Sequence, residues 1–226
     1  MDATGITAVF LKSIFSGIKK RDCVGFGRYC QENSSEKTPI EWLMLQTTGT
    51  TVLLISRCAL DCKPYQAYYK EDMTWENCDL RGWLNGEFLR NAFTGEEQKM
   101  IALSKLANDD NPEYGTSGGN TTEDRVFCLS LAEAETLFES RDARKCIPTP
   151  YAVKQGADKY GISEKSNCQI DGRACCWWWL RSPGMSEYDA SCVGSDGYID
   201  SCGDFKCYDD MAVRPALRVN VSGENC

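Results

Sequence analysis

The chain has 226 residues, of which 42% are hydrophobic and 26% charged, values that are ordinary for a globular protein with a sizeable core. Its formal net charge of −8 argues against nucleic acid as a partner, because phosphate binding needs clustered lysine and arginine. No apolar run approaches the roughly 18 residues of a transmembrane helix, so we predict no membrane span.

Two residue types depart from ordinary usage: the sequence has no histidine and 14 cysteines. Without histidine, Ser-His-Asp and Cys-His catalysis are excluded in their usual forms. The cysteines do not form the paired Cys-x-x-Cys motifs of a zinc site. We therefore expect no metal and no cofactor, and we expect most cysteines to be small buried side chains or free surface thiols. A disulfide-rich protein is the alternative.

Residues 1–17 are predicted to form an N-terminal amphipathic helix or extension, followed by one domain over residues 18–226. The segment lacks the basic leader and small-residue cleavage site of a signal peptide. We expect the helix to pack on the domain, with oligomerisation or attachment as the alternative. Apolar residues recur at helical spacing in and just after it: Ile6, Val9, Phe10, Ile14 and Ile18.

Strands are predicted in the first part of the domain. Residues 22–29 and 40–45 have the composition of short strands. Residues 42–45 and 52–56 are strongly hydrophobic and are separated by a connection that contains Gly49. This pattern predicts a β-hairpin with buried strands.

Helices are predicted in the middle of the chain. One follows Thr74, and another spans residues 149–156. Thr94-x-x-Glu97 and Ser130-x-x-Glu133 are capping boxes, in which each pair satisfies free amide groups at a helix start. We expect the helix after Thr94 to include residues 100–103, residues 108–123 to form a long loop, and residues 125–129 to form a strand.

The last fifth of the chain changes composition twice. Apolar frames at residues 177–184 and 212–219 enclose residues 185–211, which are rich in Tyr, Ser, Asp, Gly and Cys. Recognition loops have this composition. The Asp196-Gly197 pair predicts a hairpin turn, with Val193 and Ile199 inward and polar neighbours outward. Pro215 predicts an edge or a bulge in a final strand over residues 213–219. The predicted fold class is α+β, with helices in the middle and strands towards both ends.

Several motifs, in this order, resemble a widespread bacterial and phage domain family of uncharacterised function. The resemblance covers about residues 18–221. Its motifs are Phe26-Gly27-Arg28-Tyr29, Pro39-Ile40-Glu41-Trp42-Leu43, Leu54-Ile55-Ser56, Leu80-Arg81-x-Trp83-Leu84-Asn85, Phe93-Thr94-x-Glu96-Glu97, Trp178-Trp179-Leu180-Arg181-Ser182-Pro183-Gly184 and Val213-Arg214-Pro215-Ala216-Leu217.

Family members with this ending resemble the variable proteins of diversity-generating retroelements. The resemblance implies a C-type-lectin-like fold, akin to the branch that contains the formylglycine-generating enzyme. It also implies a ligand- or receptor-binding protein whose C-terminal segment is diversified by adenine-directed mutagenic reverse transcription.

The composition of residues 185–211 supports this resemblance. Asn codons of the type AA-pyrimidine, randomised at both adenines, give Tyr, Ser, Asp, Gly, Cys and Phe among others, but never Lys, Glu, Met, Gln or Trp. The segment is enriched in the accessible types. Met185, Glu187, Lys206 and Met211 are not accessible and are expected to be fixed. The alternative is that residues 185–211 are a Gly/Ser/Asp-rich loop that no retroelement has diversified.

We therefore predict a non-catalytic protein that binds a protein or cell-surface ligand. Tyr188, Tyr198 and Tyr208 are the expected aromatic anchors. The six aspartates of the segment favour a basic partner surface. The cysteines of the segment are expected to face outward and to be replaceable. The candidate contact residues are Ser186, Tyr188, Asp189, Ser191, Cys192, Ser195, Tyr198, Asp200, Ser201, Cys202, Asp204, Cys207, Tyr208, Asp209 and Asp210.

The tryptophans and arginines of the two apolar frames are expected to stabilise the fold and not to contact a ligand. At least two of the three tryptophans Trp177, Trp178 and Trp179 should lie in the core, because burial is the larger stabilising use of this side chain. Arg181 and Arg214 should pair with buried carboxylates.

Two alternative functions remain open. A formylglycine-generating type of thiol enzyme would use Cys175 and Cys176, although nothing in the sequence places a general base beside them. A calcium-dependent lectin would use Asp196, Asp200 and Asp204 as oxygen ligands, although the hairpin turn separates the first two and the spacing of a helix-loop-helix calcium site is absent.

Overall fold

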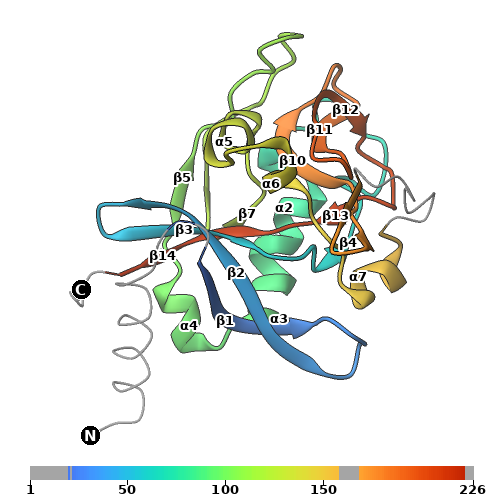
Figure 1. Cartoon of the computed structure of the whole chain (residues 1–226). Helices are drawn as coiled ribbons and strands as arrows, with labels where there is room; N and C mark the ends of the chain where they lie inside the picture. The colour runs from blue at the N-terminus through green and yellow to red at the C-terminus, as the bar shows by residue number, and fades with distance from the viewer. Residues whose placement is uncertain (1–19, 21, 158–167, 222–226) are drawn as a thin grey trace, which may run out of the picture.

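Two five-stranded sheets organise the chain, with short helices packed around them (Figure 1). The structure is a computed structural model and describes residues 20, 22–157 and 168–221. The predicted N-terminal helix lies outside these residues. Within them, no helix is long enough and apolar enough to cross a membrane. The mixture of helices and mostly antiparallel strands confirms the predicted α+β class.

The first sheet has the strand order β1 (Cys23–Cys30), β2 (Lys37–Thr48), β3 (Thr51–Ser56), β14 (Ala216–Asn220), β7 (Val126–Phe127). The second has the order β12 (Ile199–Phe205), β11 (Asp189–Val193), β10 (Trp178–Pro183), β13 (Ala212–Val213), β4 (Asp61–Cys62). Two smaller sheets pair β5 (Ser104–Leu106) with β6 (Thr122–Asp124), and β8 (Gln169–Ile170) with β9 (Arg173–Ala174). The helical segments are η1 (Trp75–Asn77), α2 (Asp79–Trp83), the π-helical turn η2 (Leu84–Phe88), α3 (Leu89–Ala92), α4 (Gly95–Met100), α5 (Leu131–Leu137), α6 (Arg141–Arg144) and α7 (Pro150–Gln155).

The predicted hairpin is present and is longer than expected. β2 and β3 pair from Trp42↔Ser56 to Thr48↔Thr51, so the turn shrinks to Gly49 and Thr50. Residues 52–56 are all buried, in agreement with their continuous hydrophobicity.

The two capping boxes form as predicted. The Thr94 hydroxyl accepts a hydrogen bond from the Glu97 amide, and a Glu97 carboxylate oxygen accepts one from the Thr94 amide. Ser130 and Glu133 repeat this exchange. The helix after Thr94 ends at Met100, however, and Leu103 is exposed beyond it.

Pro215 lies at neither an edge nor a bulge of one final strand, so that prediction is wrong. Residues 213–219 divide into β13 and β14, which belong to different sheets, and β14 is an interior strand between β3 and β7. Because proline has no N–H, its place at the crossing between sheets costs no ladder hydrogen bond. Its carbonyl still accepts from the Ser56 amide at 2.9 Å.

Buried tryptophans fill the core, and their indole N–H groups are satisfied. Trp178 and Trp179 are fully buried whereas Trp177 is 41% exposed, which confirms that at least two of the three belong to the core. Trp178 Nε1 donates to the Arg144 carbonyl at 3.2 Å, and Trp179 Nε1 donates to the Lys63 carbonyl at 3.0 Å.

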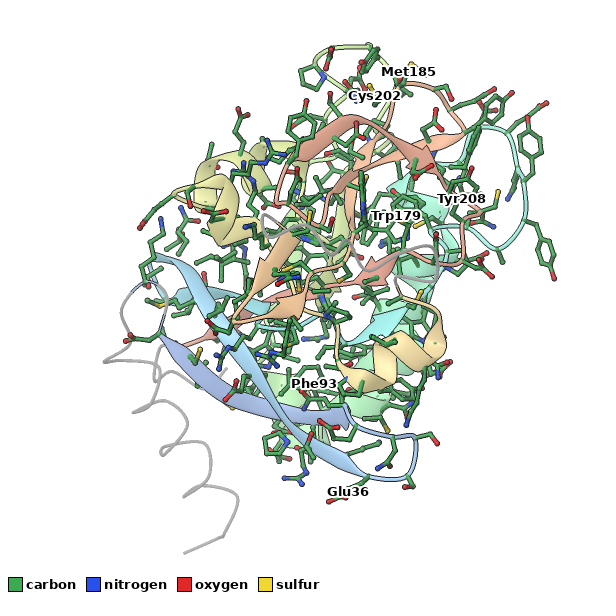
Figure 2. The ribbon with its side chains drawn as sticks, turned by 45° about the vertical axis from the view of Figure 1, so that its right-hand side comes forward. Glu36, Phe93, Trp179, Met185, Cys202 and Tyr208 are labelled. Atoms are coloured by element: carbon green, nitrogen blue, oxygen red, sulfur yellow. The ribbon has the colours of Figure 1, made fainter. Side chains whose placement is uncertain are left out.

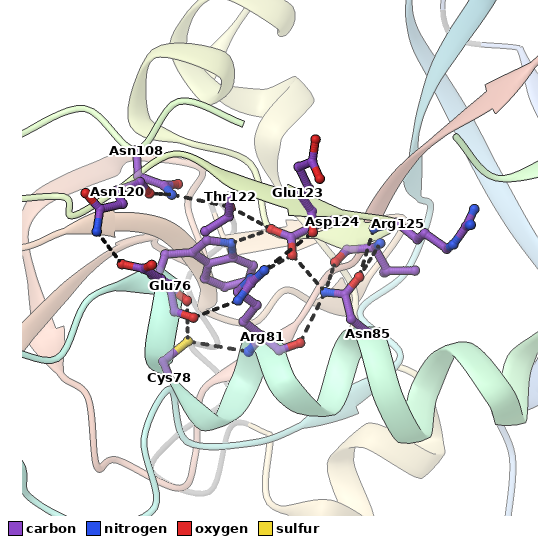
Figure 3. Close-up of polar contacts among 12 residues, drawn as sticks. Glu76, Cys78, Arg81, Asn85, Asn108, Asn120, Thr122, Glu123, Asp124 and Arg125 are labelled. Carbon is purple, nitrogen blue, oxygen red and sulfur yellow. Dashed lines mark hydrogen bonds and ion pairs between the residues drawn. The ribbon is translucent and has the colours of Figure 1, made fainter. Parts of the chain in front are cut away.

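A buried polar network around Asp124 ties the helices to the strands (Figure 3). Its carboxylate accepts from Trp75 Nε1 at 3.0 Å, from Arg81 Nε at 2.6 Å and from the Thr122 hydroxyl at 2.8 Å. The Asn85 amide nitrogen adds a further contact at 3.3 Å. A charge this deeply buried is tolerated because it is paired and hydrogen-bonded.

The cysteines behave as small interior residues or free thiols, as predicted. The thirteen cysteines that the structure describes are all free, and eight of them are buried.

The two frame arginines differ in their partners. Arg181 pairs with a carboxylate, as predicted, but this is the half-buried Glu133 and not a buried one. Arg214 instead donates from Nε and Nη1 to the carbonyls of Ser56 and Arg144, each at 3.0 Å.

We expect Arg214→Gln to lower the free energy of unfolding by about 3 kcal/mol. Arg214 is 1% exposed, and the shorter amide would remove its donors from the Ser56 and Arg144 carbonyls, of which the Arg144 carbonyl keeps Trp178 Nε1. Chemical denaturation of the variant and the parent measures this difference.

The matched control is Arg57→Gln. Arg57 pairs with Glu41, but the two side chains are 51% and 56% exposed, so the expected loss is below about 1 kcal/mol. Equal losses in the two variants would contradict a structural role for Arg214.

Candidate ligand-binding face

The hairpin predicted at Asp196-Gly197 is present and forms the edge of the second sheet. β11 pairs with β12 from Asp189↔Phe205 to Val193↔Ile199. Gly197 has φ +80°, and a Cβ there would lie 2.0 Å from the Arg141 carbonyl oxygen, so the turn requires glycine. Val193 is buried and Ile199 half-buried, as expected.

Strand β11 is not a contact surface. It lies between β10 and β12, and all five of its residues are buried. The Ser191 hydroxyl donates to the Pro183 carbonyl at 2.6 Å, and the Asp189 carboxylate accepts from Ser186 at 2.5 Å. The expectation that Cys192 faces outward is therefore wrong, and Asp189, Ser191 and Cys192 cannot reach a ligand. Ser195 in the turn is also buried.

The remaining candidates gather on strand β12 and at its two ends. Figure 2 shows Cys202 and Tyr208 on the outer side of the second sheet, with Trp179 in the interior. Tyr198 is 54% exposed and Tyr208 is 45% exposed. Tyr198 lies by Arg141 at the opposite end of the hairpin from Tyr188 and Tyr208. The exposed or half-buried candidates are Ser186, Tyr188, Tyr198, Asp200, Ser201, Cys202, Asp204, Cys207, Tyr208, Asp209 and Asp210.

Segments far away in the sequence join this strand, and the sequence analysis missed them. The Tyr69 ring packs against the Tyr188 ring at 5.0 Å between centroids. The Tyr114 hydroxyl lies 2.8 Å from Cys202 Sγ. Tyr68 is 81% exposed. Two adjacent tyrosines in a stretch without helical or strand periodicity were the available signal for Tyr68 and Tyr69.

We call this surface the β12 face. It comprises β12, the flanking residues 185–188 and 206–210, the turn residue Tyr198, and Tyr68, Tyr69 and Tyr114 from the neighbouring loops. Of the ten exposed large hydrophobic side chains in the described part of the chain, seven belong to it: Tyr68, Tyr69, Tyr114, Met185, Tyr198, Phe205 and Tyr208. Aromatic side chains gathered on one exposed surface are typical of an interaction site.

The backbone of the β12 face is fixed by buried side chains. The Asn111 amide nitrogen lies 2.8 Å from the Pro183 carbonyl oxygen, 3.2 Å from that of Gly184 and 2.9 Å from that of Ser201. Residues on the face can thus differ without altering these bonds, because the acceptors are main-chain atoms.

Lys206 has a similar role at the other end of β12. Its ammonium donates to the carbonyls of Met73 and Glu187, each at 2.6 Å. Burial lowers the pKa of Lys206 from its ordinary value. The bonds join the loop before η1 to the loop before β11, so this buried lysine is part of the scaffold.

The aspartates contribute less free charge than the sequence suggests. Asp196 pairs with Arg141. The Asp200 carboxylate accepts from the amides of Cys202 and Gly203 at 3.1 and 3.2 Å. Burial raises the pKa of Asp204. Arg141 of α6 and the backbone amides of β12 therefore already engage some of these carboxylates, which leaves less negative charge to attract a basic partner.

The residues of the two alternative functions are poorly arranged for that chemistry. Cys175 and Cys176 are buried, burial raises the pKa of Cys175 to about 11, and burial raises that of Cys176 well above its usual value. A buried protonated thiol is a weak nucleophile. Among residues 20, 22–157 and 168–221, no three His, Cys, Asp or Glu side chains converge as metal ligands.

The contrast in burial predicts different outcomes for two cysteines. Cys192→Ser should lower the free energy of unfolding by about 1–3 kcal/mol, because it places a hydroxyl in an apolar interior. Cys207→Ser, at an exposed position, should change it by less than about 0.5 kcal/mol. Thermal and denaturant unfolding of both variants test the pair, and indistinguishable stabilities would argue against the buried position of β11.

The comparisons with known proteins identify a family without an assigned function. No curated protein and no solved structure matches the chain. A family model described as a domain of unknown function, DUF6273, matches residues 49–221, which is well over half of the sequence. β1 and β2 both precede the matched residues although they share a sheet with β3. The chain belongs to the DUF6273 family.

Proposed function

We propose that this chain is a non-catalytic binding protein whose β12 face contacts a protein or cell-surface ligand. The observation that carries the proposal is the clustering of exposed aromatic side chains on that face. Tyrosine supplies a large amphipathic contact area with few torsions to restrict, which suits recognition of varied partners. Hot-spot residues at interfaces are enriched in the same side chain.

We further propose that the face is diversified by a retroelement and that the fold is C-type-lectin-like. The connection of the frames supports this. β10 and β13 are parallel neighbours, with Trp178 paired to Ala212, so residues 185–211 connect two adjacent strands of one sheet. Both ends of the segment are held by buried strands, and the segment can change between them.

The positions that adenine mutagenesis cannot reach also support the proposal. Lys206 and Met211 are buried, and Lys206 holds two carbonyls. Two of the residue types that the mutagenesis cannot produce therefore stand at buried positions that support the backbone of the face. Met185 and Glu187, the other two inaccessible types, are exposed, and packing gives no reason for them to be constant.

Deep sequencing of the locus across sister clones tests the diversification. We expect substitutions at the exposed positions of residues 185–211 whose residue types the mutagenesis can reach. We expect constancy at β11, in both frames and at the four inaccessible types, Met185, Glu187, Lys206 and Met211. A nearby reverse-transcriptase gene and a near-copy repeat differing at adenines should accompany this pattern. Substitutions spread evenly along the chain would contradict the proposed diversification of residues 185–211.

Replacement of Tyr188, Tyr198 and Tyr208 together by Ala should abolish ligand binding while leaving the melting temperature nearly unchanged. The three rings are at least partly exposed and contribute little to the core. Peptides selected on the parent protein from a displayed random library provide the binding probe, and circular dichroism follows the fold.

The control variant is Tyr29→Phe, compared with the parent. The Tyr29 hydroxyl donates to buried Asp61 at 2.6 Å. Tyr29 lies on β1, the edge strand of the first sheet, and is far from the β12 face in the sequence. This variant should lose stability and retain peptide binding. Retained binding in the triple variant, or its unfolding, would count against the proposed recognition surface.

A further inference from the structure

The β12 face contains an apolar pocket at the end of the strand where Phe205 lies. Its walls come from two segments far apart in the sequence: Tyr69 and Met73 on one side, and Tyr188, Phe205 and Cys207 on the other. The pocket has a volume of about 150 Å³. Tyr69 and Phe205 are 60% and 50% exposed, so the pocket opens to solvent.

We propose that this pocket receives one phenyl or phenol ring, the side chain of a Phe or Tyr on the ligand. The proposal rests on the proposed function, in that it names the anchoring group of the partner. Size is the first argument. An engineered cavity of about 150 Å³ with apolar walls binds benzene, so a pocket of this volume suits a single six-membered ring.

The shape and chemistry of the walls favour an aromatic ring over an aliphatic side chain. The rings of Tyr69, Tyr188 and Phe205 line the pocket, and those of Tyr69 and Tyr188 lie 5.0 Å apart at 36°. An entering ring can therefore pack in offset or edge-to-face geometry, which adds to the gain from burying its area.

The charged groups at the pocket disfavour a cationic occupant. Lys206 and Lys70 both line it, against one carboxylate, Glu187. The Lys206 ammonium is already bonded to two carbonyls, so it stays in the wall and repels a second cation. The pocket thus differs from the aromatic cages that bind ammonium groups.

The test titrates the full-length chain with p-cresol, the side-chain analogue of tyrosine, and follows backbone amide resonances by NMR. We expect saturable shifts at Tyr69, Tyr188 and Cys207, with Kd on the order of 1 mM. 4-Methylcyclohexanol, of similar size without a π system, and n-butylamine should each bind at least about fivefold more weakly. Absence of saturable shifts for p-cresol, or preferential binding of n-butylamine, overturns the inference.

Two substitutions at one position provide a matched pair. Cys207→Phe places a ring in the pocket from its own wall and should weaken p-cresol binding at least tenfold, whereas Cys207→Ser should alter it less than about twofold. Since Cys207 is exposed, both variants should fold, and their amide spectra verify this. Tyr69→Ala provides a second test from the other wall, with Tyr114→Ala, outside the pocket, as its control. Equal affinities across these pairs would place the p-cresol elsewhere and refute the assignment.

The outcome separates this inference from the proposed function. If p-cresol fails to bind while the triple tyrosine variant no longer binds the selected peptides, the pocket assignment is wrong and the proposed binding face is supported. If p-cresol binds as expected and the triple variant still binds the peptides, the pocket assignment is supported and the proposed recognition surface is wrong.

Discussion

The side-chain amide of Asn111 is the contact on which the geometry of the β12 face depends. Its two N–H hydrogens serve three carbonyl oxygens, two where the first frame ends at Pro183 and Gly184 and one on β12 at Ser201. Asn111 is 2% exposed, so no solvent competes for these acceptors. The amide, from a loop outside residues 185–211, thereby joins the exit of one strand to the middle of another. Buried carbonyls need donors in any case. Supplying them from outside the segment frees the aromatic side chains of the face from this task, although Asp196 and Asp200 still hold the hairpin through Arg141 and through backbone amides.

Local signals in the sequence were sufficient for much of the fold. The capping boxes at Thr94 and Ser130 and the turn at Asp196-Gly197 depend on residues within three or four positions of one another, and each forms as predicted. The burial of Trp178 and Trp179 also followed from residue type, because a large ring in an apolar run gains most from the core.

Features that depend on sheet order could not be predicted from the sequence. Asp189, Ser191 and Cys192 have the composition of a surface strand, yet β11 is interior because β10 and β12 flank it. Their polar groups are accommodated by local partners such as the Pro183 carbonyl. Pro215 was placed wrongly for the same kind of reason, since nothing near it in sequence indicates that the two halves of its strand enter different sheets. Tyr68 and Tyr69 join the β12 face only through the tertiary fold.

The burial of β11 divides residues 185–211 into two classes with different tolerance to change. At Cys192, which is fully buried, a larger side chain meets close-packed neighbours and a polar one lacks partners. Even Gly203 on β12 is constrained, because a Cβ there would lie 2.2 Å from the Ala190 carbonyl oxygen. Mutagenesis changes codons whether the encoded side chain is buried or exposed, whereas the fold accepts changes only at exposed positions. A scaffold can therefore sustain diversification only where the mutable codons encode outward-facing side chains. In this chain such positions lie along the edge strand and at its ends, and the aromatic side chains there are free to differ because Asn111 and Lys206 hold the backbone beneath them.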